Sequence, residues 1–162
     1  MSQPIPDLWP EIRPATQTAP VAILREQADR LAEKTVGLVE GEVNTASIPP
    51  VAPLSRGDSV VYLSSIGEAH EIRKAIAPKD ASLVHSLYLK VPSLDNYRCL
   101  LVTVIHGRQY YPLSISYALT DQQVRADSEN EFLQFLKQFL SDKATKDLIE
   151  ALMAQVPTAK QS

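Results

Sequence analysis

Three apolar, strand-like runs follow one another between residues 83 and 119, and only short breaks at Pro92, at Asp95–Asn96 and at Gly107 separate them. Strands joined by such short connections must pair antiparallel, because a parallel pair needs a crossover of about a dozen residues or more. The segment 83–119 is therefore predicted to form an antiparallel meander. No other feature of the chain limits its fold as strongly, because this one sets the direction of neighbouring strands.

The three predicted strands differ in their apolar pattern. In 83–91, most of the large apolar residues occupy every second position, which predicts one buried face. In 97–105, apolar residues occupy both the odd and the even positions, as expected for a central strand that is covered on both faces. In 110–119, Pro112 cannot donate a ladder hydrogen bond, so this strand is predicted to lie at a sheet edge or to begin there.

Helical patterns lie on both sides of the meander. A helix is predicted from Pro20 to near Gly37, with Thr18 available as its cap. Near the other end, Ser128 and Glu131 match the capping-box pattern. The segment that follows them carries all three phenylalanines at helical spacing, and this stripe is expected to pack on the sheet: Phe132, Phe135 and Phe139.

Ser141 can cap a second C-terminal helix. Runs of strands followed by helices are typical of the α+β class. We therefore predict an α+β fold with an antiparallel sheet of about four to five strands, covered by an N-terminal helix and two C-terminal helices.

The chain is predicted to have three parts. Prolines at positions 4, 6, 10 and 14 remove backbone donors and favour extended geometry, so 1–17 should be an extended arm. Residues 18–156 should form a single domain, because a chain of 162 residues with 44% apolar and 22% charged residues suits one globular core. Residues 157–162 should be a frayed tail.

Between the first helix and the meander, the pattern is less regular. Residues 38–43 alternate as in a strand with one wet face, and Gly41 indicates a bulge or a close backbone approach. Residues 44–58 are rich in proline and small polar residues and are predicted to form a flexible loop. Residues 59–77 fit either a strand followed by a helix or a longer strand.

Charge and hydropathy argue against two classes of partner. Lys and Arg number 16 against 19 for Asp and Glu, and the mixed cluster around Arg73, Lys74 and Lys79 lacks the basic footprint of nucleic-acid binders. The chain has no apolar run of about 18 residues, so we expect no membrane span. Its N-terminus lacks a leader pattern, so a cytoplasmic location is the default expectation.

Catalytic and metal-binding patterns do not emerge from the sequence. The histidines His70, His85 and His106 lack metal-ligand spacing, although paired strands could bring the last two together. Neither a nucleophile elbow nor a glycine-rich phosphate loop can be formed. Cys99 is interpreted as a small buried hydrophobe, the alternative being a reactive thiol. No catalytic residue, metal or cofactor is predicted.

The leading hypothesis is a non-enzymatic interaction protein, such as an adaptor, inhibitor or accessory subunit. It would bind a protein partner or another copy of itself through its arm, its sheet edge or its tyrosine-bearing surface. The candidate residues are Trp9, Ile12, Asp95, Asn96, Tyr97 and Tyr110. Two alternatives remain open: the apolar arm residues pack back on their own domain, and the tyrosines serve only to pack the strands.

A second hypothesis comes from a different functional class. The chain could be a small-molecule-binding domain or a hydrolytic enzyme with a pocket between the sheet and the helices. The residues expected to line that pocket are His85, Tyr88, His106 and Tyr117.

Overall fold

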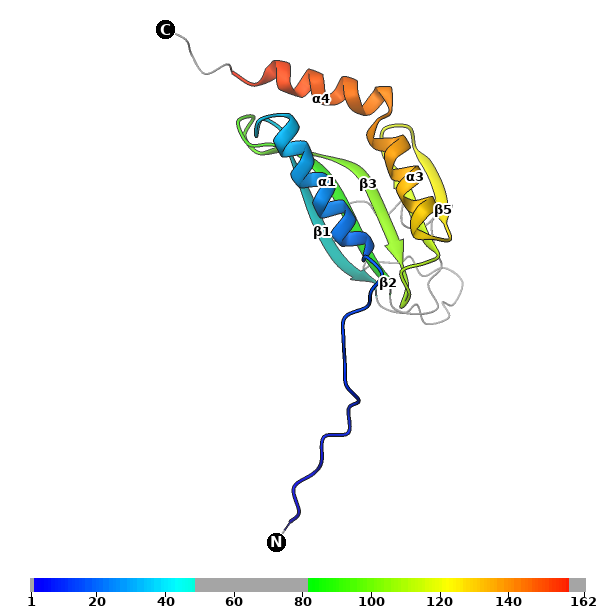
Figure 1. Cartoon of the computed structure of the whole chain (residues 1–162). Helices are drawn as coiled ribbons and strands as arrows, with labels where there is room; N and C mark the ends of the chain where they lie inside the picture. The colour runs from blue at the N-terminus through cyan, green and yellow to red at the C-terminus, as the bar shows by residue number, and fades with distance from the viewer. Residues whose placement is uncertain (1, 49–81, 158–162) are drawn as a thin grey trace, which may run out of the picture.

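The computed structural model describes residues 2–48 and 82–157, and it confirms the predicted α+β fold (Figure 1). Its elements, in chain order, are α1 (Pro20–Lys34), β1 (Glu40–Ile48), β2 (Ser82–Val91), β3 (Tyr97–His106), β4 (Leu113–Tyr117), β5 (Gln122–Ala126), α3 (Glu129–Leu140) and α4 (Lys143–Gln155). The strands form one antiparallel sheet in the order β1-β2-β3-β4-β5.

β3 lies at the centre of the sheet. This confirms the prediction of a central strand, which was made because the side chains on both faces of this strand are apolar. The strand predicted in 110–119 is Leu113–Tyr117, and it begins directly after Pro112, as one of the two alternatives expected. The other alternative, an edge position, is wrong, because β5 pairs along the outer side of β4. β5 was not predicted, because its segment QQVRA has little apolar alternation.

The predicted flexible loop at 44–58 is wrong over its first residues. β1 continues to Ile48, because residues 44–48 pair in register with β2, from Asn44 opposite Ser86 to Ile48 opposite Ser82. Pairing with β2 gives this polar segment the hydrogen-bond partners that its sequence does not suggest. The remaining loop residues, the ambiguous segment 59–77 and the tail beyond 157 lie outside the described residues.

The helix ends show which caps the chain uses. Ala19 is the N-cap of α1 and makes no side-chain cap, so the prediction for Thr18 is wrong. The N-cap of α4 is Asp142, whose carboxylate accepts from the Ala144 N–H, whereas the predicted Ser141 ends α3. Ser128 caps α3 as predicted.

The Ser128 hydroxyl accepts from the Glu131 N–H at 3.2 Å. The other half of the predicted capping box differs, because the Glu131 carboxylate accepts from the N–H of Asp127 at 2.8 Å. Both contacts satisfy donors at the start of α3.

The three helices of the described residues lie on one face of the sheet (Figure 1). α1 packs on β1, and α3 packs on β5 and reaches β4 through Phe139, whose ring stacks on that of Tyr117 with centroids 4.7 Å apart. α4 turns back from α3 toward the C-terminal end of α1. The core lies between this helical layer and the sheet, and its fully buried members include Leu24, Leu89, Val104, Ile115 and Phe132.

α1 lies against β1 at Gly41, which confirms the predicted close backbone approach. A Cβ at this position would lie 2.5 Å from Ala28 Cβ and 2.6 Å from Ala28 Cα. Both distances are shorter than van der Waals contact, and the second involves backbone, so a side chain could be admitted only if the helix moved away.

We therefore expect Gly41→Ala to lower the free energy of unfolding by about 1–3 kcal/mol, the range for overpacked sites. Chemical denaturation measures this change. Gly107→Ala is the matched control, because a Cβ at that position has no atom within 4 Å. Equal midpoints for the two variants would contradict the close packing of α1 on β1.

Candidate functional site

His85 and His106 form a buried pair on the helix-covered face of the sheet. The two side chains come from β2 and β3, and their Nε2 atoms lie 2.9 Å apart. Exposed fractions of 2% and 3% show that water scarcely reaches either ring. The antiparallel register creates this contact. His85 lies opposite Val104 and His106 lies opposite Leu83, so the two histidines are diagonal neighbours on the same face of the sheet.

The hydrogen-bond partners assign the tautomers of the pair. The Gly107 carbonyl can only accept, so His106 Nδ1, at 2.9 Å from it, carries a proton. Neutral His106 then accepts at Nε2 from the Nε2–H of His85. The remaining nitrogen, His85 Nδ1, accepts from the Thr45 hydroxyl at 2.9 Å. Every polar ring atom of the two histidines therefore has a partner when both rings are neutral.

Burial lowers the pKa of His85 from 6.5 to about 4, with further lowering by His106 and by Arg25 on α1. His85 is therefore neutral at pH 7, and its contact with His106 is a buried polar link between the strands. Two imidazoles alone do not make a metal centre, and the described residues contain no cluster of three or more His, Cys, Asp or Glu that could hold a metal ion.

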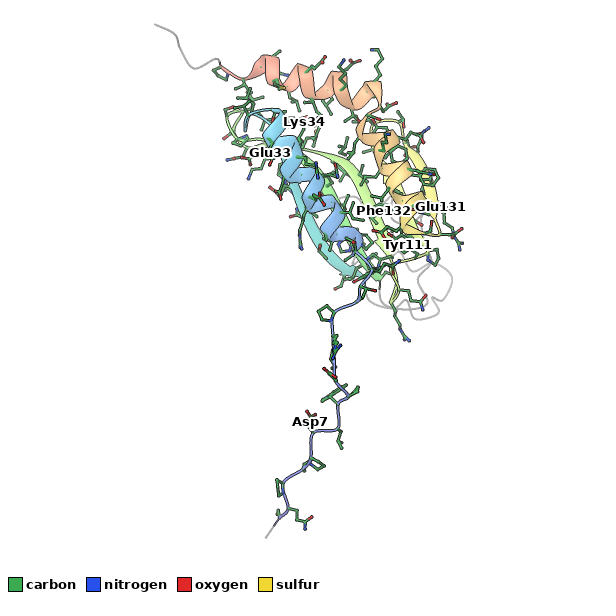
Figure 2. The ribbon with its side chains drawn as sticks, in the orientation of Figure 1. Asp7, Glu33, Lys34, Tyr111, Glu131 and Phe132 are labelled. Carbon is green, nitrogen blue, oxygen red and sulfur yellow. The ribbon has the colours of Figure 1, made fainter. Side chains whose placement is uncertain are left out.

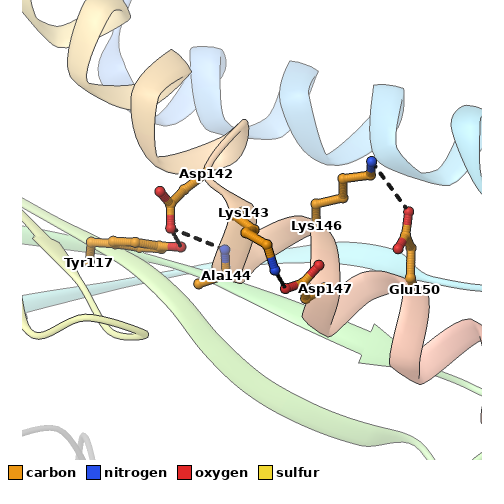
Figure 3. Close-up of polar contacts among 7 residues, drawn as sticks. All are labelled: Tyr117, Asp142, Lys143, Ala144, Lys146, Asp147 and Glu150. Carbon is orange, nitrogen blue, oxygen red and sulfur yellow. Dashed lines mark hydrogen bonds and ion pairs between the residues drawn. The ribbon is translucent and has the colours of Figure 1, made fainter.

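Tyr117 is also structural in this arrangement. Its side chain is 1% exposed, and its hydroxyl lies 2.5 Å from Thr145 Oγ1 and 3.3 Å from a carboxylate oxygen of Asp142 (Figure 3). Burial raises the pKa of this phenol. The contacts connect β4 to the first turn of α4, so the hydroxyl helps to fix the position of that helix.

The structure does not gather the four residues predicted for a pocket. Tyr88 has the opposite parity to His85 on β2 and lies on the other face of the sheet, where the Arg98 guanidinium sits 4.1 Å from its ring centroid. Arg98 also pairs with Glu42 at 2.9 Å. Only His85 and His106 come together, and Tyr117 contacts α4 instead.

The residues predicted for partner binding lie at separate places. Asp95 and Asn96 have φ angles of 57° and 55° in the turn that joins β2 to β3, and Tyr97, 45% exposed, follows that turn. Tyr110 lies beyond the opposite end of β3, with its ring edge-on to that of His106 at 5.7 Å. The length of β3 separates the two groups, so they do not form one surface.

Cys99 lies on β3 and is half-buried. Burial raises the pKa of its thiol, with smaller opposing contributions from hydrogen bonds of Tyr97 and Leu89. A raised pKa leaves little thiolate at neutral pH, and this supports the interpretation of Cys99 as a packing residue.

The arm is the most exposed apolar part of the described chain. Ile5, Leu8, Trp9 and Ile12 are 87%, 81%, 77% and 73% exposed. The alternative that Trp9 and Ile12 pack back on their own domain is therefore wrong, and Figure 1 shows the arm leading away from the sheet. Pro-rich sequence keeps the backbone extended, which leaves these side chains without neighbours from the domain.

A local hydrogen bond shapes the arm around its tryptophan. The Asp7 carboxylate, labelled in Figure 2, accepts from the Trp9 N–H at 3.0 Å. Further along, the Arg13 guanidinium donates to Glu11 at 2.8 Å. Both are exposed contacts between near neighbours, so each adds little stability and can be exchanged for a contact with another molecule.

An apolar groove lies between α1 and the C-terminal helices, above the sheet, and none of the four residues predicted for a pocket lines it. Leu31 of α1 forms part of one wall, Leu140 and Ile149 form part of the other, and Leu89 and Leu101 lie at its floor. Its volume is about 220 Å³. We call it the α1–α4 groove.

The floor of the groove depends on a bulge in β3. The partner of β2 changes from Val102, opposite Leu87, to Leu100, opposite Tyr88. Leu101 is therefore an extra residue in β3, and its carbonyl accepts from the Ala118 N–H at 2.9 Å. Such a bulge redirects a side chain. Here it accompanies the contribution of Leu101 to the groove floor.

Cations surround the groove. Arg30 and Lys34 line it from α1, and Lys34 is labelled at the end of that helix in Figure 2. A second hollow of about 490 Å³ adjoins it and shares Gln27, Lys34 and Leu140 with it. Lys137 lines this second hollow. Among the described residues that line the two hollows there is no carboxylate. Arg30 is paired with Glu26 at 2.7 Å, so Lys34 and Lys137 supply the positive charge of the two hollows.

Comparisons with models of known families, with curated proteins and with solved structures find no match to this chain. Among the described residues, no helix has both the length and the apolar character that crossing a membrane requires.

Proposed function

We propose that this chain is a non-enzymatic interaction protein that binds another polypeptide through its N-terminal arm in the cytoplasm. The observation that carries this proposal is the exposure of Ile5, Leu8, Trp9 and Ile12 on one extended segment. Side chains of this size gain about 1.5–3 kcal/mol each when they are fully buried. Contiguous exposed apolar side chains therefore mark a surface that another molecule covers.

The backbone of the arm suits such a role. Proline-rich segments are already extended, so they lose little conformational entropy on binding. Tryptophan is among the residues that contribute most to protein interfaces, and Trp9 stands at the centre of the apolar set. Adaptor, inhibitor and accessory-subunit roles all rest on this same binding step.

Photo-crosslinking in the native cell tests the proposal. A photoreactive residue is placed at position 9 in one variant and at position 36 in a control variant. Val36 is 88% exposed and apolar, but it stands alone in the turn after α1. We expect discrete protein adducts from position 9 that excess unlabelled chain suppresses, and none of these adducts from position 36.

Identical adduct patterns from the two positions would contradict the proposal, because the arm would then bind no better than any exposed apolar residue. The absence of any protein adduct at position 9 would contradict it as well. An adduct between two copies of the chain and an adduct with another protein both agree with it.

A further inference from the structure

The partner of the arm follows from comparing the arm with the α1–α4 groove. We propose that the arm of one copy binds in the α1–α4 groove of a second copy, so that the chain forms a dimer by exchanging arms. This inference rests on the proposed function, because it names the partner of the same arm.

The chemistry of the two surfaces is complementary. The arm alternates apolar side chains with acidic ones, since Asp7 precedes Leu8 and Trp9, and Glu11 precedes Ile12. Glu11 is paired with Arg13 at 2.8 Å, and this exposed pair has to be exchanged for a contact with the groove. The groove offers an apolar floor with cations around it and no carboxylate among its described lining residues. Apolar side chains can therefore enter the groove while the carboxylates approach Lys34 and Lys137 at its margin.

The dimensions of the two surfaces also agree. An extended polyproline-type backbone rises about 3.1 Å per residue, so Leu8 and Ile12 lie about 12 Å apart along it. A helix rises about 1.5 Å per residue, so the α1 wall from Gln27 to Lys34 is about 10 Å long. The segment from Leu8 to Ile12 is thus about as long as the wall that it would contact.

The direction of the arm favours a second copy over the chain's own groove. Ala15 and Gln17 lie beside Tyr110 and Tyr111, in a hollow at the base of the arm. From this base the arm leads away from the sheet, whereas the Lys34 end of α1 lies at the far side of the domain (Figures 1 and 2). Binding in its own groove would require the arm to reverse direction after this base.

In an exchange between two copies, both arms and both grooves make contacts. In a two-fold dimer the same patch of each copy is used, so each arm occupies the partner's groove and the contact is repeated. Two arm contacts bury twice the apolar area of one. The reciprocal arrangement also leaves neither surface unoccupied, which stops the chain from assembling further.

The test uses the full chain at a series of concentrations, with two measurements. Sedimentation gives the mass, and the fluorescence of Trp9, the only tryptophan, reports whether its ring is exposed to water. We expect the mass to double and the emission to shift to shorter wavelength over the same concentration range. Truncating an interface anchor residue weakens binding by about 30-fold, and the dimer contains two such anchors, so we expect Trp9→Ala to raise the dimer Kd by about 1000-fold.

Charge reversal separates the two surfaces. One variant carries Lys34→Glu with Lys137→Glu, and another carries Asp7→Lys with Glu11→Lys. Each should weaken its own dimer by roughly tenfold or more, because like charges then meet at the groove margin. Mixing the two should restore dimers, since each arm then meets a groove of opposite charge. Lys143→Glu with Lys146→Glu is the control, because both lysines are exposed on α4 outside the groove.

Three results would overturn the inference. The first is a chain that stays monomeric with an exposed Trp9. The second is a monomer whose Trp9 is shielded at every concentration, because its arm then binds its own groove. The third is a dimer that neither reversal weakens. The proposed function would survive the first result if position 9 still crosslinks to a different protein, and this separates the failure of the two proposals.

Discussion

Replacing Phe132 by alanine is expected to lower the free energy of unfolding by about 3–5 kcal/mol, the range for emptying a buried aromatic site. Phe132 is fully buried and belongs to the core cluster between α3 and the sheet (Figure 2). Its removal leaves a cavity that the paired strands cannot collapse to fill. Chemical denaturation with an unchanged slope measures the loss.

Leu133→Ala is the control on the same helix. Leu133 is 42% exposed, so its truncation should change stability by no more than about 0.5 kcal/mol. Similar losses for the two variants would mean that α3 does not present Phe132 to the sheet.

Phe135, expected to be buried with its neighbours, is only half-buried, because the direction of the stripe places it at the margin of the contact. Its truncation should cost less than that of Phe132.

Lowering the pH from 6.5 to 4 is expected to reduce the free energy of unfolding by about 3 kcal/mol through His85 alone. The pKa of this residue falls from 6.5 to about 4 on folding. A pKa difference of one between the folded and unfolded chain changes the free energy of unfolding by about 1.4 kcal/mol. Between these values the unfolded chain binds a proton at His85 that the folded chain does not. Stability is therefore complete above pH 6.5 and declines as the pH falls toward 4.

His85→Gln isolates this effect. A glutamine amide can donate to His106 in place of the imidazole Nε2–H, and it does not titrate in this range. His106 and Arg25 are the charged or titratable groups that act on His85, and both remain in the variant. Denaturation at pH 7 and pH 4.5 should show a smaller loss in the variant than in the parent chain. Equal losses would show that His85 is not held neutral by the fold.

The arm was recognised from the sequence because its signal is local. Prolines spaced through its residues exclude regular structure, and Trp9 and Ile12 stand out among them. Strand direction was predictable for a similar reason, since short connections leave no other pairing. The capping of α3 by Ser128 also follows from residues within one turn of each other.

The α1–α4 groove could not be found in this way. It lies between α1 and the C-terminal helices, so the residues of its two walls are more than 100 positions apart in the chain. Nothing in the sequence of either helix states how far apart they will lie on the sheet. The groove also depends on the bulge at Leu101 and on the position of α4, which Tyr117 and Thr145 help to fix.

The sequence by itself determined the elements whose cause is local: the extended arm, the antiparallel meander and the amphipathic helices. Tertiary structure alone decided the rest, namely the pairing of β5, the continuation of β1, the contact of His85 with His106 and the groove. The physical reason is that backbone geometry and hydrophobic periodicity act over a few residues. Register and helix spacing are instead set by packing between segments that are distant in the chain.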